Sequence, residues 1–399
     1  MPASGKIGIV PAWGAVIAMA LCATILISSE FMPVSLLSPI ARDLAITEGH
    51  AGQSISISGF FALITSLFIS AIIGVSDRRR VVLIFTVLMI VSGVMVALAP
   101  NAPLLMAGRA LLGVAIGGFW SISAAIVMRL VPEESVPNAL AILNGGNAVA
   151  TTLGAPIGSL IGGLIGWRGA FFCVVPLAVV ALAWQWRSLP ALPPEKATIR
   201  ARDVFALLKH RQFAIGMIAV SLFFFGQFTL FTYLRPFLDL VTGNDAPLIS
   251  AILLALGIAG FVGTIMIGWL LKSHLYSLLI TIPAMLAVIA ITMVEIDGTP
   301  LTAGLLLTLW GLLATAAPVG WWTWLSRTMP HEAEAGGGLM VAIIQLAIML
   351  GAIVGGALFD AWGYRGPFSV AAGLLVIASL LAFVTSRIGA ARRLAEQPA

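Results

Sequence analysis

The sequence predicts an all-α polytopic membrane protein with twelve transmembrane helices. The 399 residues are 60% hydrophobic and only 9% charged, with a mean hydropathy of +1.09. A water-soluble domain carries about 25% charged residues, so this composition excludes a soluble globular protein. The apolar runs are continuous over span length, whereas the strands of a membrane barrel would alternate polar and apolar residues over about 10 positions.

Each predicted span is a mostly apolar segment close to the roughly 20 residues that cross a bilayer as a helix. In order, the expected segments are 13–38, 51–73, 81–99, 103–128, 139–163, 168–186, 213–238, 248–271, 276–294, 300–324, 337–359 and 367–386. An even number of spans places both termini on one side of the membrane. Sixteen of the 21 Lys and Arg residues then lie on that side, which the positive-inside rule makes cytoplasmic.

A polar, Pro-rich and basic stretch, 187–212, interrupts the spans near the middle of the chain. It predicts a cytoplasmic linker between two six-helix halves, residues 1–186 and residues 213–399, of which the second ends in a short cytoplasmic tail.

The two halves also resemble each other in sequence. Segments 153–172 and 350–369 share eight identities at a constant offset of 197. Such a repeat predicts two pseudo-symmetric bundles related by an axis along the membrane normal, with the substrate site midway between them.

Several motifs resemble those of the major facilitator superfamily, over essentially the whole chain. "GVSDRRRVVL" (74–83) lies in the loop after the second span, where the family carries a G-x-x-x-D-R-x-G-R-R-type signature. Asp77 and Arg78 match it, whereas Gly74 is one residue too close and the second glycine is missing. "RALLGVAIGG" (109–118) matches the family's R-x-x-x-G pattern in the fourth span, and "GAPIGSLIGG" (154–163) resembles the Gly-Pro motif of its proton-coupled exporters.

Further stretches narrow the resemblance. "EFMPVSLLSPIARDL", "GGFWSISAAIVMRLVP", "GQFTLFTYLRPF" and "APVGWWTW" are similar to bacterial drug:proton antiporter-type exporters, most of all to purine ribonucleoside efflux permeases. The resemblance implies the major facilitator fold, a place in the bacterial cell inner membrane, and proton-coupled export of small polar solutes by alternating access. Purine ribonucleosides are the first substrate class that it implies. Sugar or arabinose exporters, multidrug exporters and a solute uptake symporter stay open as alternatives.

Glu30 is the acid that the predicted spans place deepest in the membrane. It lies eight residues before the predicted end of its span at Ser38, or about 12 Å below the outer edge. Intramembrane acids face interior cavities and mark proton or ion paths. Desolvation favours the protonated acid and a nearby cation favours the carboxylate, so movement of substrate or cation would change its proton occupancy. We predict that Glu30 carries the coupled proton; an acid at a frayed helix end before Pro33 is the alternative.

Two arginines are further candidates for proton coupling. Arg109 lies about seven residues into the fourth span, where an arginine either takes part in coupling or anchors backbone carbonyls. Arg235 lies beside Pro236 near the outer end of the seventh span. It either pairs with Glu30, contacts the substrate or snorkels to the interface.

Aromatic residues mixed with amides and hydroxyls indicate a planar polar ligand that is stacked and then hydrogen-bonded at its edge. The substrate-binding candidates are Trp120, Gln227, Tyr233, Trp310 and Trp321. Trp322 or Trp324 is assigned to the aromatic belt at the membrane surface. The gating candidates are Asp77 and Arg78, whose loop is expected to face 335–340, together with Gly154, Pro156 and Gly158.

No catalytic residue, metal or cofactor is expected. The four histidines, His50, His210, His274 and His331, are scattered without ligand spacing, which argues against a polytopic membrane enzyme. A channel would need a filter or a charged ring, whereas one buried acid between duplicated halves favours alternating access. The expected partners are a small-molecule substrate, protons and the lipid bilayer, with no nucleic acid, and the protein is expected to work as a monomer.

Overall fold

The computed structural model describes residues 11–73, 76–132, 135–193, 207–295, 299–329 and 333–396, and these ranges are helical apart from short turns. The helices are α1 (Trp13–Asp43), α2 (Glu48–Ile73), α3 (Arg78–Ala97), α4 (Ala102–Leu130), α5 (Val136–Ser188), the 3-10 turn η2 (Leu207–Lys209), α7 (Arg211–Phe231), α8 (Leu234–Thr242), α9 (Ala246–Glu295), α10 (Pro300–Ala314), α11 (Ala317–Thr328), α12 (Ala333–Trp362) and α13 (Arg365–Glu396).

Eleven described segments are long and apolar enough to cross a membrane. One of them, Leu153–Ser188, contains two crossings, because the backbone of α5 turns at Gly166 with φ 79° and ψ 164°. The two arms, 136–165 and 167–188, are each longer than the roughly 20 residues that a crossing needs. Dividing α5 at Gly166 therefore gives the predicted twelve crossings within the described residues.

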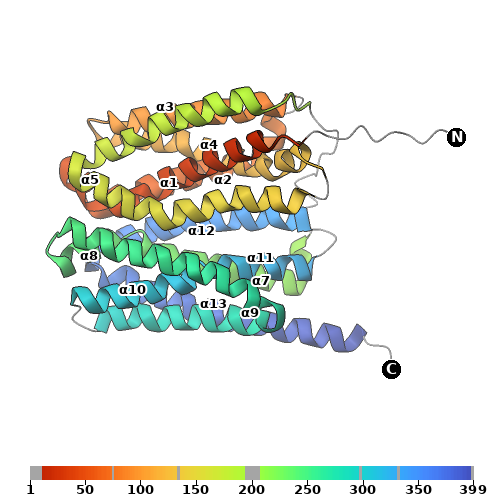
Figure 1. Ribbon diagram of the computed structural model, residues 1–399. Coiled ribbons are helices and arrows are strands. Elements are labelled where there is room, and N and C mark those ends of the chain that lie inside the picture. Colours follow the sequence, from red (N-terminus) through yellow and green to blue (C-terminus); the bar gives the residue numbers. More distant parts are fainter. Residues whose placement is uncertain are drawn as a thin grey trace.

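The helices form two groups that lie side by side (Figure 1). The N-terminal group contains α1 to α5 and the C-terminal group α7 to α13, and each group has a large apolar core of its own. The groups meet where α2 packs on α12, the first arm of α5 on the start of α9, and α1 on α8. Helix α1 begins and α13 ends at the same end of the bundle, which we name the termini side; the other end is the far side.

The sequence repeat corresponds to equivalent turns and helix contacts. Gly166 and Gly363, which are identical at the offset of 197, both have a positive φ (79° and 61°) and both lie at a far-side turn between two crossings. Glycine adopts this backbone conformation at no steric cost. Gly154 packs α5 against Ser28 of α1, and its counterpart Gly351 packs α12 against Phe228 of α7. The repeated glycines thus make the same kind of contact in each group.

Candidate functional site

Glu30 lies deep inside the bundle at the contact between the two groups. Only 3% of its surface is exposed, and α1 continues as a helix for thirteen residues beyond it to Asp43. The alternative of a frayed helix end before Pro33 is therefore wrong. The carboxyl group of Glu30 has a side-chain hydrogen bond to Gln345 of α12 and a charge interaction with Arg109 of α4.

The neighbouring ring also crosses between the groups. Phe31 of α1 stacks on Phe228 of α7, with ring centroids 5.6 Å apart and an interplanar angle of 26°. Glu30 and Phe31 thus bring an acid and an aromatic face to the same boundary, where any relative movement of the groups changes their surroundings.

Arg109 is fully buried and joins three helices of the N-terminal group. Its Nη1 donates to the Ser29 carbonyl at 2.7 Å, and its Nη2 donates to the Glu30 carbonyl at 2.9 Å and to Ser58 Oγ at 3.0 Å. Its Nε donates to the Ser54 carbonyl at 3.0 Å. The guanidinium group is therefore bonded to backbone and hydroxyl oxygens of α1 and α2. Of the two roles expected for Arg109, proton coupling or anchoring of backbone carbonyls, these contacts are those of an anchor.

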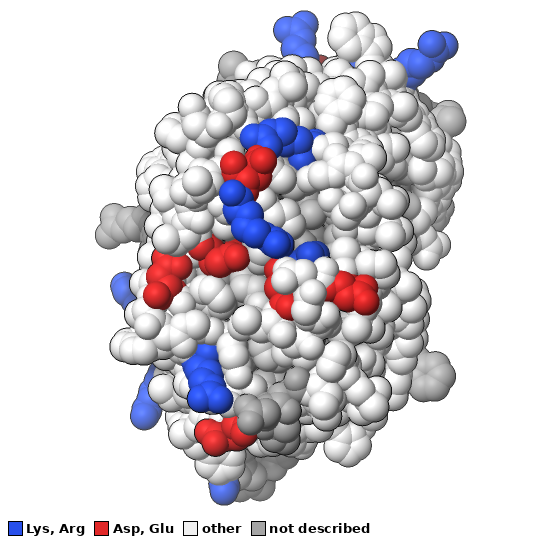
Figure 2. All heavy atoms as spheres, turned by 90° about the vertical axis from the view of Figure 1, so that its left-hand side faces the viewer, with Lys and Arg blue, Asp and Glu red and all other residues white. Residues whose placement is uncertain are grey.

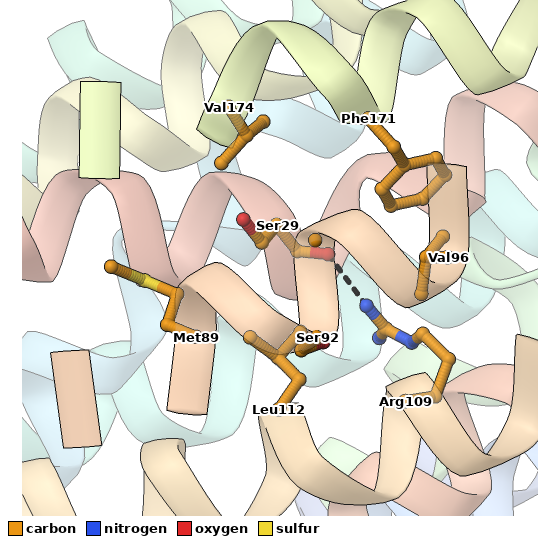
Figure 3. A pocket seen from close by; sticks show the side chains of 9 residues that line it. Ser29, Met89, Ser92, Val96, Arg109, Leu112, Phe171 and Val174 are labelled. Atoms are coloured by element: carbon orange, nitrogen blue, oxygen red, sulfur yellow. Dashed lines mark hydrogen bonds between the residues drawn. The ribbon is translucent and has the colours of Figure 1, made fainter. Parts of the chain in front are cut away.

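The Ser29 carbonyl needs this donor because of a proline. In an α-helix the carbonyl of residue i−4 accepts from the N–H of residue i, and Pro33 has no N–H to offer. Inside a membrane an unpaired carbonyl costs several kcal/mol, by the order of magnitude known for buried polar groups. Arg109 supplies the missing donor, and the bond is visible in Figure 3.

Close contact between α4 and α2 brings Arg109 to its acceptors. A side chain at Gly113 would collide with the Ser58 carbonyl, and one at Gly117 with the Ala62 carbonyl. These glycines let the two backbones touch. Beside Arg109, Ser29 and Ser92 lies a cavity of about 10 Å³ for the centre of a water molecule, closed by Met89, Leu112, Phe171 and other apolar side chains (Figure 3). It is large enough for about one water and too small for a substrate.

Arg235 is also buried, with 5% exposure, but it joins the two groups. From α8 its Nη1 donates to the Ser35 carbonyl of α1 at 3.1 Å and to Ser159 Oγ of α5 at 2.9 Å. Its Nε donates to Asp239 Oδ1 at 2.9 Å within α8. The Ser35 carbonyl is again one that a proline leaves unpaired, because Pro39 lies four residues later.

Further polar contacts surround Arg235 on the far side. Ser250 of α9 donates to Ser159 Oγ at 3.0 Å, and Arg42 of α1 lies 3.8 Å from Asp239. Figure 2 looks onto this side and shows acidic and basic side chains gathered across the middle of a mostly uncharged face. Among the described residues, Arg235 does not pair with Glu30, which was one of the roles expected from the sequence.

A second far-side contact joins α12 to the beginning of α2. The Asp360 carboxylate accepts from Thr47 Oγ1 at 2.8 Å and from the Gly49 N–H at 3.0 Å. A carboxylate at a helix N-terminus is stabilised by the helix dipole as well as by these bonds. We name the Arg235 and Asp360 contacts together the far-side latch.

The substrate candidates differ in how completely their side chains are used in packing and hydrogen bonding. Tyr233 and Trp321 are 0% and 1% exposed; Tyr233 donates to the Ala352 carbonyl at 2.7 Å, and Trp321 packs on Trp324 at 5.9 Å. Both pack against neighbouring helices in this conformation, but Trp321 Nε1 is a buried atom without a hydrogen-bond partner among the described residues. Trp324 is itself fully buried, whereas Trp322 is 42% exposed, so of the two residues expected at the membrane surface only Trp322 remains a candidate.

The other three candidates also have a polar atom or an aromatic ring that is not fully used in packing. Trp120 is half-buried at the edge of Phe119. Gln227 Oε1 and Trp310 Nε1 are buried atoms that have no hydrogen-bond partner among the described residues. These two atoms are an acceptor and a donor that a polar ligand would satisfy.

The gating candidates lie within the N-terminal group. Asp77 Oδ1 accepts from the N–H groups of Arg79 at 2.8 Å and Leu192 at 3.1 Å, and the Arg78 N–H donates to the Leu192 carbonyl at 2.9 Å. Asp77 thus caps α3 and holds the chain that follows α5; this contact, rather than the expected one to 335–340, is what the described residues show. In α5, the buried Pro156 lies between Gly154 and Gly158. Gly154 faces Ser28 of α1, and Gly158 faces Ser35 of α1.

Gln345, Asp239 and Asp360 are polar residues of this region that the sequence analysis missed. Asp239 and Asp360 fall at segment ends, where an acid usually faces water, and Gln345 is uncharged. The prolines of α1 give no signal for these three residues, because the carbonyls that they leave unpaired accept from Arg109 and Arg235. Within the described ranges, no three His, Cys, Asp or Glu side chains lie together as a metal site would require.

Relatives of the chain agree with this architecture. Residues 19–348 match the family described as Major Facilitator Superfamily. The chain is 53% identical over 381 residues to "Transcription regulatory protein OpdE" of Pseudomonas aeruginosa, covering 94% of each protein. It is 42% identical over 378 residues to "Purine ribonucleoside efflux pump NepI" of Salmonella paratyphi A and of Salmonella typhimurium, covering 95% of each.

Solved structures show the same fold at low sequence identity. A bacterial homologue of the human lysosomal transporter Spinster, inward-facing and unoccupied, superposes with a TM-score of 0.78 at 16% identity, covering 94% of this chain and 97% of that one. A D-xylose–proton symporter superposes with a TM-score of 0.77 at 16% identity, covering 93% and 97%. The chain belongs to the Major Facilitator Superfamily: it is a multi-pass membrane transporter and not an enzyme.

Proposed function

We propose that this transporter is a proton-coupled exporter of small polar solutes, with purine ribonucleosides as the preferred class, and that it works as a monomeric antiporter. The observation that carries the proposal is the place of Glu30. A glutamate that is only 3% exposed at the contact between two groups of helices is costly, and such acids in membrane proteins serve proton or ion movement.

The coupling step follows from the partners of Glu30. When the acid is neutral it needs only hydrogen bonds such as that with Gln345, whereas its carboxylate also needs a cation or water. Arg109 is held by four oxygens and cannot leave to follow the charge. Loss of the proton therefore favours an arrangement that opens Glu30 to water or to a substrate.

The alternating movement is assigned to the two groups of helices. We take residues 1–186 and 213–399 as the halves that rock, joined by 187–212, and the far-side latch as the contact that closes one entrance. The excess of Lys and Arg on the termini side favours a cytoplasmic location for that side in the inner membrane of a bacterium. In this conformation the latch closes the route to the outside.

Purine ribonucleosides are favoured by the similarity to NepI and by unpaired groups in the C-terminal group. The 42% identity extends over 95% of both proteins. A nucleoside has a flat face that stacks on aromatic rings such as Trp120, and edge groups that pair with Gln227 Oε1 and Trp310 Nε1. Sugars or amphiphilic drugs are the alternative substrates, and uptake by symport is the alternative direction.

A second candidate function comes from the 53% identity to OpdE, a protein named as a transcription regulator. In that case the chain would sense or admit a solute whose presence changes transcription, rather than export it for its own sake. Both candidates keep the transport architecture, and they differ in whether purified protein alone moves solute against a gradient.

The test is intracellular retention of radiolabelled inosine in bacterial cells with and without the protein, repeated with a protonophore. Export predicts lower retention in expressing cells and loss of the difference when the proton gradient collapses. Higher retention in expressing cells would overturn export in favour of symport. No difference with inosine, together with a difference with a labelled sugar, would overturn the nucleoside assignment.

A further inference from the structure

A pocket of about 490 Å³ lies on the termini side of the N-terminal group, away from the contact with the C-terminal group. It is formed where α3 begins and where α5 ends. Its lining residues are Asp77, Arg79, Arg80, Leu83, Trp186 and Ala191. None of the transport steps above uses it.

The walls of the pocket are held by hydrogen bonds between α3 and the end of α5. Asp77 accepts from the N–H groups of Arg79 and Leu192, so its negative charge is shared with the first turn of α3. The Arg79 side chain donates from Nη2 to the carbonyl of Trp186 at 2.5 Å. The bond to the Trp186 carbonyl holds the guanidinium group of Arg79 at the pocket.

One donor at the pocket has no acceptor among the described residues, although the Asp77 carboxylate and the Trp186 carbonyl lie nearby. Arg79 Nε is buried and has no hydrogen-bond partner among the described residues, although its Nη2 is bonded. Arg80 is exposed beside it and adds a second positive charge. A buried N–H of a guanidinium group is costly when unpaired, and phosphate is the anion whose geometry matches the arginine fork.

The two helices that form the pocket also carry exposed apolar side chains. On α3, Ile84 and Val87 are 57% and 42% exposed, and on the second arm of α5, Val180 and Trp186 are 55% and 65% exposed. Apolar side chains with this exposure on membrane-crossing helices contact acyl chains. Trp186 at the end of its helix has the position of an interfacial tryptophan, level with lipid headgroups.

We propose that this pocket binds the phosphate of an anionic phospholipid, with the headgroup at Arg79 and Arg80 and the acyl chains along α3 and the second arm of α5. Basic pockets on the cytoplasmic side of transmembrane helices bind anionic headgroups by this chemistry. The bound lipid would tie the beginning of α3 to the end of α5, next to Leu192 and the start of the connection between the two groups.

The test is lipid retention by the full-length protein, measured by native mass spectrometry after incubation with phosphatidylglycerol or phosphatidylcholine of matched chains. We expect preferential retention of phosphatidylglycerol, and about tenfold weaker retention in R79Q/R80Q, from the loss of charge-assisted bonds. The matched control is R211Q, because Arg211 is an exposed arginine at the first residue of α7, outside the pocket. This control should retain the lipid as the unmodified protein does.

The single variant R80Q keeps the bond between Arg79 and Trp186, so its fold is expected to be unperturbed, and it should lose part of the preference. Equal retention of phosphatidylglycerol by R79Q/R80Q and the unmodified protein would overturn the proposal. Inorganic phosphate provides the second arm. Competition by millimolar phosphate that displaces the lipid completely would overturn a lipid site in favour of a free-anion site, whereas retention in its presence supports the lipid.

Discussion

Two buried arginines, Arg109 and Arg235, make the same kind of hydrogen bond to α1 but from different groups of helices. Each donates to a carbonyl of α1 that a proline leaves unpaired: Ser29 in the case of Pro33, and Ser35 in the case of Pro39. The chemistry is the same, but Arg109 comes from α4 of the same group, whereas Arg235 comes from α8 of the other group.

The difference decides which contact is permanent. Groups of helices that rock as units keep their internal bonds and exchange the bonds between them. The Arg109 bonds hold α1, α2 and α4 together and persist through such a movement, so they belong to the fold. In the proposed movement the Arg235 bonds break when the far side opens, and these bonds would then set the conformational equilibrium.

Loss of Arg109 should give the largest effect. R109Q removes the charged donor of four bonds and leaves several buried oxygens unpaired, at a cost of about 3–5 kcal/mol in the free energy of unfolding. We expect poor expression and a strongly lowered thermal unfolding midpoint in detergent.

P33A provides the sharper test, because it returns an N–H to the Ser29 carbonyl. The penalty of R109Q should be smaller in the P33A background; an equal penalty in both backgrounds would contradict the assigned bond.

Loss of Arg235 should leave the fold intact and open the far side. The reporter is a thiol introduced by S250C in a C22S/C173S background, with the protein in lipid nanodiscs. We expect R235Q to raise the labelling rate of this thiol about tenfold, because the lost charged hydrogen bonds contribute about 1.5 kcal/mol to the closed arrangement. R168Q is the matched control, because Arg168 lies on the same side but bonds to Asp43 and the Ala99 carbonyl within its own group. Equal labelling of R235Q and the parent protein would refute the latch.

A smaller effect should follow from crowding the Asp360 contact. In G49A the added methyl group would overlap the Asp360 carboxylate and lie 2.7 Å from the Gly356 carbonyl, which pushes α2 and α12 apart on the far side. At about 1 kcal/mol for such overpacking, the labelling rate should rise roughly fivefold. G145A has open space at its Cβ and should leave the rate unchanged. A G49A protein that labels like G145A would show that this contact does not close the far side.

The smallest effect should come from Gln345. Q345L removes the hydrogen bond to Glu30 from the other group while both charged residues stay in place. One neutral hydrogen bond changes an equilibrium by about threefold to tenfold, so we expect a modestly altered response of inosine flux to the pH gradient. The double variant E30Q/Q345L should behave like E30Q alone. Additive effects of the two changes would place Gln345 outside the coupling step.

The sequence was sufficient to predict the fold and to place Glu30 inside the membrane-spanning bundle. Span-length apolar runs and the 197-residue repeat predicted the crossings, and the repeat reappears in Gly166 and Gly363 as a shared backbone conformation. Glu30 could be found because a carboxyl group in mid-span is costly and therefore conspicuous.

The partners of the arginines could not be predicted in the same way. Arg109 and Arg235 both look like intramembrane charges in sequence, and their acceptors lie 80 and 200 residues away on α1. The burial of Trp324 has the same cause: its ring packs on Phe213 of α7 with centroids 6.1 Å apart, a contact that helix periodicity within α11 does not reveal. The buried face of a helix was predictable only where a charged side chain would be energetically unfavourable in contact with lipid.

The central claim is that Glu30 couples proton movement to solute movement. The direct measurement is flux of labelled inosine in proteoliposomes driven by an imposed pH gradient, with E30Q beside the unmodified protein and the thermal unfolding midpoints matched as a control of folding. The account predicts gradient-driven inosine accumulation by the unmodified protein, and in E30Q a flux that only equilibrates the solute whatever the gradient. Gradient-driven accumulation of equal size in E30Q would contradict it.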